Sequence, residues 1–279
     1  MAANINTSTS NVALPSIGSA LDATDTELTG ITDAYQLGIA ATVLYLGAVG
    51  DRYGRKRMLL LGAFLCVPFS LMSAWSPTAV FLIGAQIAVG VSGGMLYPTT
   101  LSMITALWRG KKLTAAIALW TGIGTGASVL GPILGGWLLG NYWWGSVFLI
   151  TVPLAIVVLV LGFVVLPKSA AEHNEPVDHQ GGTLSVIMIS SLVLGIVMLP
   201  QGITITVGVL FAVMLVSGFL FVRRERRAPN PLFDLKMAAI PTFWVAFVAG
   251  LVAFGALVGA MFIGQQFTQN VPMYTPLHA

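Results

Sequence analysis

Apolar stretches long enough to cross a lipid bilayer recur along this chain of 279 residues. A transmembrane helix needs about 20 consecutive, mostly apolar residues. Only 8% of the residues are charged, whereas soluble domains have about 25%. The stretches are rich in Gly, Leu, Val and Ala and do not alternate with a period of two, so they predict helices and not barrel strands. Eight spans are predicted, at 32–50, 58–75, 79–106, 114–139, 145–166, 183–200, 205–222 and 241–266. The chain is therefore expected to be an all-α polytopic membrane protein.

Positive charges are unevenly distributed between the connections. All 13 Lys and Arg residues fall in four connections, at 52–57, 109–112, 168 and 223–236. Basic connections of membrane proteins face the cytoplasm, so we expect a multi-pass protein of the plasma membrane with these four connections inside. Residues 1–17 would then also have to cross the membrane for the N-terminus to be cytoplasmic, although their apolar part is too short to cross alone.

Two polar segments and one cysteine allow other interpretations. The sequence RRERR at 223–227 is compatible with a nucleic-acid patch, but it lies directly at the end of a span, where anionic lipid headgroups explain it. The loop 167–182 holds His173 and His179, whose spacing fits no helix-borne pair of metal ligands, and a solvated linker is expected. Cys66 lies in an apolar run and is predicted to be a small core residue. We therefore expect membrane lipids as partners, and no nucleic acid, metal ion or cofactor.

The first motif is GAVGDRYGRKR, residues 47–57. The Asp51 carboxylate can accept hydrogen bonds from the following turn or from a neighbouring helix, and Arg55 can pair with it or with a helix C-terminus. Gly54 is a turn glycine. Taken alone, the motif predicts an ordered loop with long cations that reach toward the interface. The candidate residues are Gly47, Gly50, Asp51, Arg52, Gly54, Arg55, Lys56 and Arg57.

The second motif is GIGTGASVLGPILGG, residues 122–136. Its glycines recur four residues apart, a spacing that lets two helices pack backbone to backbone, and its proline removes a hydrogen bond and bends the helix. A dinucleotide-binding loop is not expected, because no strand precedes GIGTG and no acid follows at about 20 residues. The candidate residues are Gly122, Gly126, Gly131, Pro132, Gly135 and Gly136.

These two motifs, in this order, resemble those of the major facilitator superfamily. GAVGDRYGRKR is similar to the loop between the second and third helices of that family, and GIGTGASVLGPILGG is similar to the fifth-helix motif of its drug:proton antiporters. Further similar segments are NVALPSI, ITDAYQL, GVSGGMLYPTTLSMI, WWGSVFLITVP and PNPLFDLKM. The two spans between 183 and 222 resemble the extra central helices of the fourteen-span branch, which exports quaternary ammonium compounds and dyes.

The resemblance implies two six-helix halves that rock about a central cavity, and it implies that part of this arrangement is missing. In this interpretation, five further spans are absent and the chain is a fragment or its reading frame is broken. The expected parts are an N-terminal half at 1–166 with an incomplete first helix, a cytoplasmic linker at 167–182, two inserted helices at 183–222, a basic loop at 223–240 and the first helix of the C-terminal half at 241–279.

Proton-coupled export of a cation requires a carboxylate inside the membrane. Once the other acids are assigned to connections, only Asp33 remains, and the resemblance implies a role for it in cation recognition or protonation. The alternative is an interfacial acid in the first turn of a helix. Tyr35 could face a cation or anchor the helix at the interface. Met95 and Trp120 are candidates for cavity lining, with plain helix packing as the alternative.

Two positions depart from the family pattern. Asn6 aligns where an aspartate usually stands, and Gln86 aligns where an arginine usually stands. Losing one member of a buried ion pair would cost about 3–5 kcal/mol, whereas losing both leaves a neutral amide pair. We therefore hypothesise that Asn6 and Gln86 are coupled substitutions. The alternative is that the start of the chain is eroded and Asn6 only appears to align.

The resemblance implies a multidrug efflux transporter, of the kind that confers antibiotic resistance, which exports small lipophilic cations in exchange for protons. An enzyme is not expected, because the sequence lacks HExxH and paired intramembrane carboxylates. The alternative from a different class is a half-transporter or inert truncation product that acts only with a second polypeptide, the missing C-terminal half.

Overall fold

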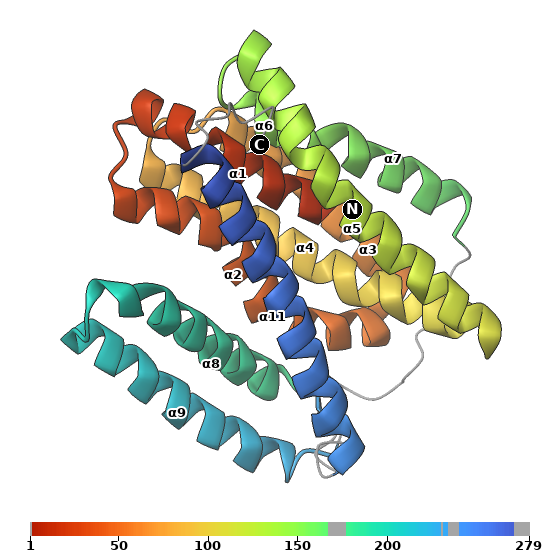
Figure 1. Ribbon diagram of the computed structural model, residues 1–279. Helices are drawn as coiled ribbons and strands as arrows, with labels where there is room; N and C mark the ends of the chain where they lie inside the picture. The colour runs from red at the N-terminus through yellow and green to blue at the C-terminus, as the bar shows by residue number, and fades with distance from the viewer. Residues whose placement is uncertain (1, 167–176, 230, 234–239, 271–279) are drawn as a thin grey trace.

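The computed structural model describes residues 2–166, 177–229, 231–233 and 240–270 of the chain (Figure 1). The described part is helical throughout and contains no strand. The helices are α1 (Ala2–Leu21), α2 (Asp25–Tyr53), α3 (Arg55–Ala74), α4 (Ala79–Leu107), α5 (Lys111–Asn141), α6 (Ser146–Leu149), α7 (Thr151–Val164), α8 (His179–Met198), the short 3-10 helix η1 (Leu199–Gln201), α9 (Ile205–Glu225) and α11 (Pro241–Asn270).

Each predicted span coincides with a helix, and the span 145–166 corresponds to α6 and α7 together. Six of these helical segments are long and apolar enough to cross a membrane: α3, α4, α5, α6 with α7, α8 and α9. The boundary between α6 and α7 is explained by a proline. Pro153 lacks the N–H that would donate to the carbonyl of Leu149, and Leu149 is the residue at which α6 ends.

The segment before α2 is helical despite its run of Asn, Ser and Thr. Hydroxyl side chains bond back to the helix itself, with Thr9 Oγ1 2.8 Å from the Ile5 carbonyl oxygen and Ser10 Oγ 2.7 Å from that of Asn6. Bonds of this kind satisfy the hydroxyls without water. α1 thereby reaches 20 residues, which corresponds to about 30 Å of helix, the thickness of the hydrocarbon core.

Short polar residues set where α2 begins and ends. Thr24 and Glu27 form a reciprocal capping box at its start, with the Thr24 N–H 2.9 Å from Glu27 Oε2. At the other end, Gly54 has φ 109°, a backbone conformation that residues other than glycine rarely adopt. Gly54 alone separates α2 from α3, so the turn predicted at this residue is confirmed.

Two glycines let α2 and α4 pack backbone to backbone. The Cα of Gly38 lies so near Gly90 that a Cβ added at Gly90 would stand 2.9 Å from it, and a Cβ added at Gly38 would overlap the Ile87 carbonyl oxygen. Neither residue has room for a methyl group. Backbone-to-backbone packing of this kind is typical of membrane helices.

The glycine motif of α5 behaves differently in its two parts. Gly131 and Gly135 are buried against α1, where a Cβ at Gly131 would overlap Ser8 and one at Gly135 would lie 3.4 Å from Thr9. Close packing is confirmed for this pair. For Gly122 and Gly126 close packing stays a prediction, because no described atom lies within 4 Å of a Cβ at either position.

Pro132 lies half-buried within α5, and Gly136 lies on the same helix, which continues through both without interruption. The proline sits between the two packed glycines of the motif.

The helices α8 and α9 form a hairpin that lies beside the group of helices α1 to α7 (Figure 1). Gly182 of α8 is seated on the ring of Tyr45 of α2, so closely that a Cβ would overlap the ring. α8 begins at His179, so the last four residues of the predicted linker 167–182 belong to this helix.

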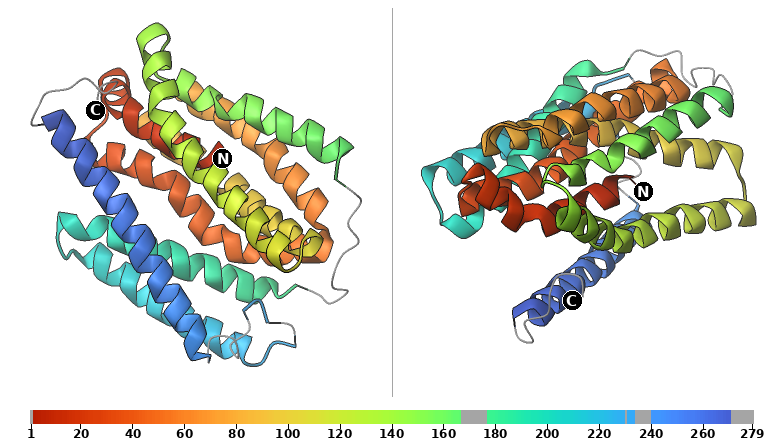
Figure 2. Two further views of the ribbon diagram at one scale, coloured as in Figure 1. Left: turned by 45° about the vertical axis from the view of Figure 1, so that its right-hand side comes forward. Right: turned by 90° about the horizontal axis from the view of Figure 1, so that it is seen from above.

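The last helix, α11, projects from the rest of the molecule in the right-hand view of Figure 2. Residues 240–253 are exposed along its described side chains. The helix is strongly apolar, and an exposed apolar helix of this length is what a membrane or a neighbouring helix would cover.

Candidate functional site

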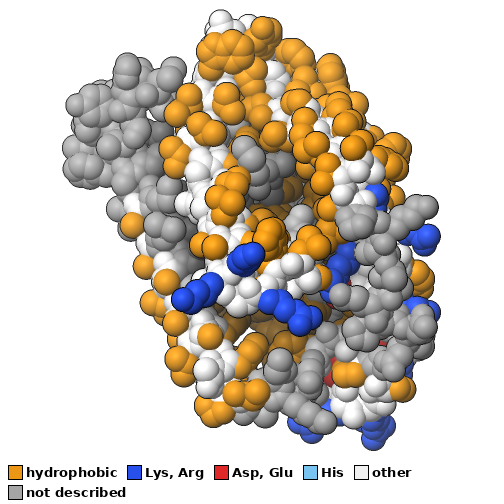
Figure 3. Space-filling model, turned by 90° about the vertical axis from the view of Figure 1, so that its right-hand side faces the viewer, with side chains coloured by type: hydrophobic (Ala, Val, Ile, Leu, Met, Phe, Trp, Pro, Cys, Tyr) orange, Lys and Arg blue, Asp and Glu red, His pale blue; other side chains and the backbone are white. Residues whose placement is uncertain are grey.

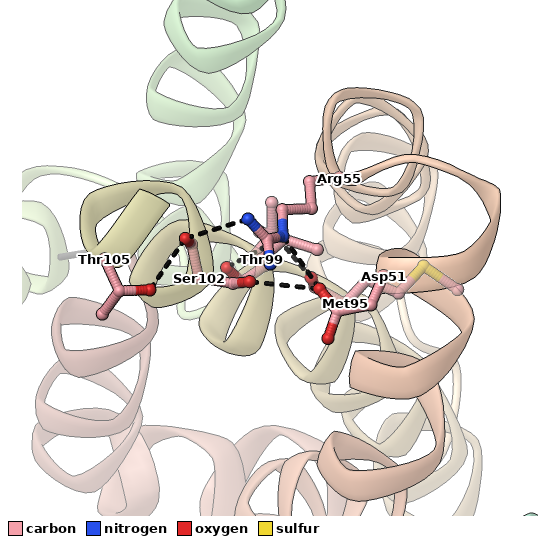
Figure 4. A network of polar contacts seen from close by, with 7 residues as sticks. Asp51, Arg55, Met95, Thr99, Ser102 and Thr105 are labelled. Carbon is pink, nitrogen blue, oxygen red and sulfur yellow. Dashed lines mark hydrogen bonds and ion pairs between the residues drawn. The ribbon is translucent and has the colours of Figure 1, made fainter. Parts of the chain in front are cut away.

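Three residues from α2, α3 and α4 form a closed polar cluster, which we call the Asp51 network (Figure 4). Arg55 Nε donates to Asp51 Oδ1 at 2.8 Å, and Ser102 Oγ donates to the same oxygen at 3.1 Å. Arg55 Nη1 donates in turn to the carbonyl oxygen of Ser102 at 3.2 Å. The predicted contacts of Asp51 with the following turn and with a neighbouring helix are therefore both present.

Packing around the Asp51 network holds the three helices together. A Cβ at Gly50 would lie 3.0 Å from Thr99 Cγ2, and one at Gly47 would lie 3.2 Å from Pro98 Cβ. The glycines let α2 approach α4 closely enough for the hydrogen bonds to form. Ser102, which the sequence motif does not contain, completes the network, and its own carbonyl also accepts from Thr105 Oγ1 at 2.9 Å.

The remaining cations of the first motif lie outside the Asp51 network. Lys56 Nζ donates to the carbonyl oxygens of Phe163 and Leu166 at the end of α7, where a positive charge is favourable. The guanidinium of Arg52 lies 5.9 Å from the centre of the Tyr53 ring. Arg57 is exposed.

Asn6 and Gln86 meet in the interior of the bundle. Asn6 Nδ2 donates to Gln86 Oε1 at 3.1 Å, between α1 and α4. The two side chains are 2% and 1% exposed, so the pair is shielded from solvent. Gln86 Nε2 has no hydrogen-bond partner in the part of the chain that the structure describes. The two positions that depart from the family pattern are thus in direct contact.

A cavity of about 170 Å³ adjoins this pair. Tyr35 and Trp120 line it, as do Asn6, Cys66, Tyr97 and Thr151. Met95 does not line it: a Cβ at Gly62 would lie 2.9 Å from Met95 Cβ, so Met95 packs between α3 and α4. Of the three candidates for cavity lining, Tyr35 and Trp120 lie at the cavity and Met95 belongs to the helix packing.

Asp33 lies half-buried on α2. It is absent from the lining of the cavity, although Tyr35, two residues further along, is part of that lining. The structure therefore separates the candidate carboxylate from the aromatic side chains.

The end of the predicted linker 167–182 carries a further polar cluster. Arg224 Nε of α9 lies 2.9 Å from Asp178 Oδ2, and the Gly181 N–H donates to Asp178 Oδ1 at 3.1 Å. Burial acts to raise the pKa of Asp178, but the hydrogen bonds from Arg224 and Gly181 lower it below its ordinary value. His179 Nδ1 is 2.7 Å from the Tyr45 hydroxyl. His173 lies outside the described residues.

The family model of the Major Facilitator Superfamily matches residues 1–277. The chain belongs to the major facilitator superfamily. Its relatives are multidrug efflux pumps, and one of them is the multidrug efflux pump LfrA of Mycolicibacterium smegmatis, which is 36% identical over 96% of this chain and 53% of its own length.

Two further relatives of this superfamily member carry names that state what they act on. The methyl viologen resistance protein SmvA of Salmonella typhimurium is 32% identical over 96% of this chain and 55% of its own length. The tetracenomycin C resistance and export protein of Streptomyces glaucescens is 30% identical over 96% of this chain and 50% of its own length. The chain spans about half the length of these relatives.

Proposed function

We propose that this chain supplies the N-terminal half of a membrane transporter that exports lipophilic cationic compounds in exchange for protons by alternating access. The single observation that carries the proposal is the match to efflux pumps along almost the whole chain. One of these relatives confers resistance to methyl viologen, which is a cationic compound. The proposal concerns a multi-pass protein of the plasma membrane with its basic connections in the cytoplasm.

The orientation is supported by where the positive charges lie. The described Lys and Arg residues follow α2, α4 and α9, which in an up-and-down bundle end on the same side of the membrane. Figure 3 shows the blue side chains in the middle and lower part of one face, below a hydrophobic upper end.

Asp33 is the residue that we propose for exchange of a proton and a cation. It is an acid within the predicted span 32–50 of α2, and acids inside a membrane are functional candidates by default. Within the described chain it forms no ion pair or hydrogen bond that would fix it in one charge state. A carboxylate in this situation can accept a proton or attract a lipophilic cation, but not both at once.

The Asn6 and Gln86 pair is proposed as a neutral replacement for a charged pair. The support is their hydrogen bond at a fully buried position. On this proposal the transporter has one proton-responsive pair fewer than its family pattern implies, and Asp33 takes a larger share of the coupling.

The Asp51 network is proposed as the gate region at the cytoplasmic side. It ties the end of α2 to α3 and α4 through one carboxylate oxygen. In a complete transporter, helices of the second half would approach this side of the molecule, and the order of the network would decide how they dock.

Transport is tested with ethidium and a proton gradient in everted membrane vesicles that contain this chain together with the C-terminal half of LfrA. Asp33→Asn is expected to abolish gradient-driven movement of ethidium, because the amide cannot exchange a proton. Asp25→Asn is the matched control, since Asp25 is an exposed acid at the start of the same helix, and it is expected to retain transport. Equal activity of the Asp33→Asn variant and the unchanged chain would contradict the role of Asp33.

A second candidate function is a half-transporter that does not transport by itself, and the observation that favours it is the coverage of about half of each relative. We expect vesicles that contain only this chain to show no ethidium movement, and co-production with the C-terminal half of LfrA to restore it. Transport by this chain alone would contradict the half-transporter. Correct membrane insertion without transport in either arm would contradict the proposed transport function.

A further inference from the structure

We infer that the cavity among α1, α2, α3, α4, α5 and α7 binds a neutral compound with a single aromatic ring and one hydrogen-bonding group, of which phenol is the simplest probe. This site is separate from Asp33 and goes beyond the proposed export of cations. Its residues come from the N-terminal helices alone, so the inference can be tested whether or not the chain transports anything.

The size of the cavity sets the size of the ligand. A cavity of roughly 150 Å³ in a protein interior holds one benzene molecule, and this cavity measures about 170 Å³. One ring with a small substituent fits this space.

The rings that line the cavity favour an aromatic ligand. Tyr97 and Trp120 meet edge to face, with ring centres 6.2 Å apart and planes at 86°. Tyr35 enters the same space from α2 and is 5% exposed. Offset or edge-to-face aromatic pairs contribute about 0.5–1.5 kcal/mol beyond the burial of their area, so a planar aromatic ring gains an attraction here that a saturated ring does not.

The charge of the lining favours a neutral ligand. Among the described side chains that line the cavity there is no Asp, Glu, Lys or Arg. An ion without a partner of opposite charge would lose its hydration, and cation–π contacts with the lining rings, worth about 0.5–2 kcal/mol, would return only part of that loss. A charged compound with the same ring is therefore expected to bind much more weakly than phenol.

One end of the cavity can bind a polar substituent. Asn6 lines the cavity and uses one N–H to reach Gln86, whereas its amide has a second N–H and a carbonyl oxygen. Directly behind it, Gln86 Nε2 is buried with no partner in the described part of the chain. A buried amide pair with hydrogen-bonding capacity left over is suited to a hydroxyl group, which both donates and accepts.

The chain carries its own reporter for this site. Cys66 lines the cavity, is 6% exposed and is the single cysteine of the sequence. Its thiol has no disulfide partner within the chain. Modification by a small thiol reagent can therefore be measured without background labelling, and Cys66→Ser serves as the blank.

The experiment measures the rate at which methyl methanethiosulfonate modifies Cys66 in the whole chain, purified in detergent micelles. Phenol at about ten times its Kd is expected to slow modification about tenfold, because only the free protein reacts. Cyclohexanol, which lacks the aromatic ring, and phenyltrimethylammonium, which carries a charge, are expected to protect far less. Equal protection by cyclohexanol or by the cation would overturn the inference.

Two substitutions on α7 provide a matched pair. Val158 lines the cavity, whereas Val160 on the same helix is 56% exposed. Val158→Phe is expected to fill the cavity and abolish protection by phenol, and Val160→Phe is expected to leave it unchanged. Val158→Ala enlarges the cavity and is expected to extend protection to 2-naphthol. This variant still tests the site if Val158→Phe fails to fold.

The melting temperature in micelles gives a further measurement that does not depend on the thiol. Phenol is expected to raise it for the unchanged chain and the Val160→Phe variant, but not for the Val158→Phe variant. If phenol changes neither the modification rate nor the melting temperature of the unchanged chain, the inference is wrong. Asp33→Asn should leave both responses intact, so failure here and failure of the proposed transport are distinguishable.

Discussion

The Asp51 network and the Asn6–Gln86 pair join the same helix, α4, to its neighbours by different means. The network uses opposite charges at the end of the bundle, and its single carboxylate oxygen accepts from both Arg55 and Ser102. The amide pair uses one neutral hydrogen bond in the interior and leaves Gln86 Nε2 without a partner in the described chain. Of these two regions, the exposed one retains charge and the buried one has none.

The difference follows from the cost of removing charges from water. Asp51 has a side chain that is 44% exposed, so it keeps part of its hydration while it binds Arg55. Gln86 is 1% exposed, and a lone charge there would be stabilised by neither water nor a partner. Substitutions that place charges at the buried pair, or remove the charge from the Asp51 network, test this comparison directly.

The largest effect is expected from Gln86→Arg alone. It places an unpaired cation against Asn6 and should destabilise the chain by about 3–5 kcal/mol. Asn6→Asp added to Gln86→Arg supplies the opposite charge and should recover a large part of that loss. The measurement is a double-mutant cycle on detergent-induced unfolding followed by circular dichroism. No recovery in the double variant over the singles would rule out the coupling of these positions.

A smaller effect is expected from Asp51→Ala. The substitution removes the shared acceptor and should cost about 1–2 kcal/mol, because hydrogen bonds to a charged group are strong but this group is partly hydrated. Asp25→Ala is the control, since Asp25 is an exposed acid of the same helix, and its loss should cost less than about 1 kcal/mol. The same unfolding assay compares the two variants, and equal costs would show that the network contributes nothing beyond a surface charge.

The stability effects of substitutions in the two regions should differ in their dependence on salt. Raising the ionic strength from about 0.01 M to about 1 M shortens the Debye length from about 30 Å to about 3 Å, so the cost of Asp51→Ala should fall by roughly half. The coupling between Asn6 and Gln86 involves no charge and should not change. Unfolding curves of both variants at the two ionic strengths provide the test, and a salt-dependent amide coupling would show that charge enters that region.

The smallest effect is expected when both amides are made apolar. Asn6→Leu together with Gln86→Leu removes the hydrogen bond and the unpartnered nitrogen at the same time, which can be nearly neutral, within about 0.5 kcal/mol. Either single substitution leaves a buried amide unsatisfied and should cost about 1–3 kcal/mol. A double variant less stable than both singles would mean that the pair contributes specific stability beyond its hydrogen bond.

Local patterns were sufficient to predict most helices and the pairing of Asp51 with Arg55. Long apolar runs have few alternatives to helices in a membrane, and two residues four apart on adjoining helical turns lie within reach of each other. Ser102 stands 47 residues away from Arg55 on another helix, and no local pattern indicates that the two meet. The contact of Asn6 with Gln86 came from alignment to a family pattern and not from their spacing.

The glycine motif shows where local reasoning is incomplete. Spacing by four predicts that a helix face can pack closely, but it does not say that a partner is present. Gly131 and Gly135 face α1, whereas Gly122 and Gly126 of the same helix meet no described atom within 4 Å. In contrast, Gly38 and Gly90 bring the backbones of α2 and α4 together, although neither belongs to the motif that the spacing identified.

The seating of Gly182 on Tyr45 has a mechanical consequence. Because even a methyl group would not fit between α8 and the tyrosine ring, α8 cannot slide or rotate against α2 without first lifting away from it. The hydrogen bond between His179 and the Tyr45 hydroxyl fastens the same point from a second direction. The hairpin of α8 and α9 is therefore expected to move together with α2.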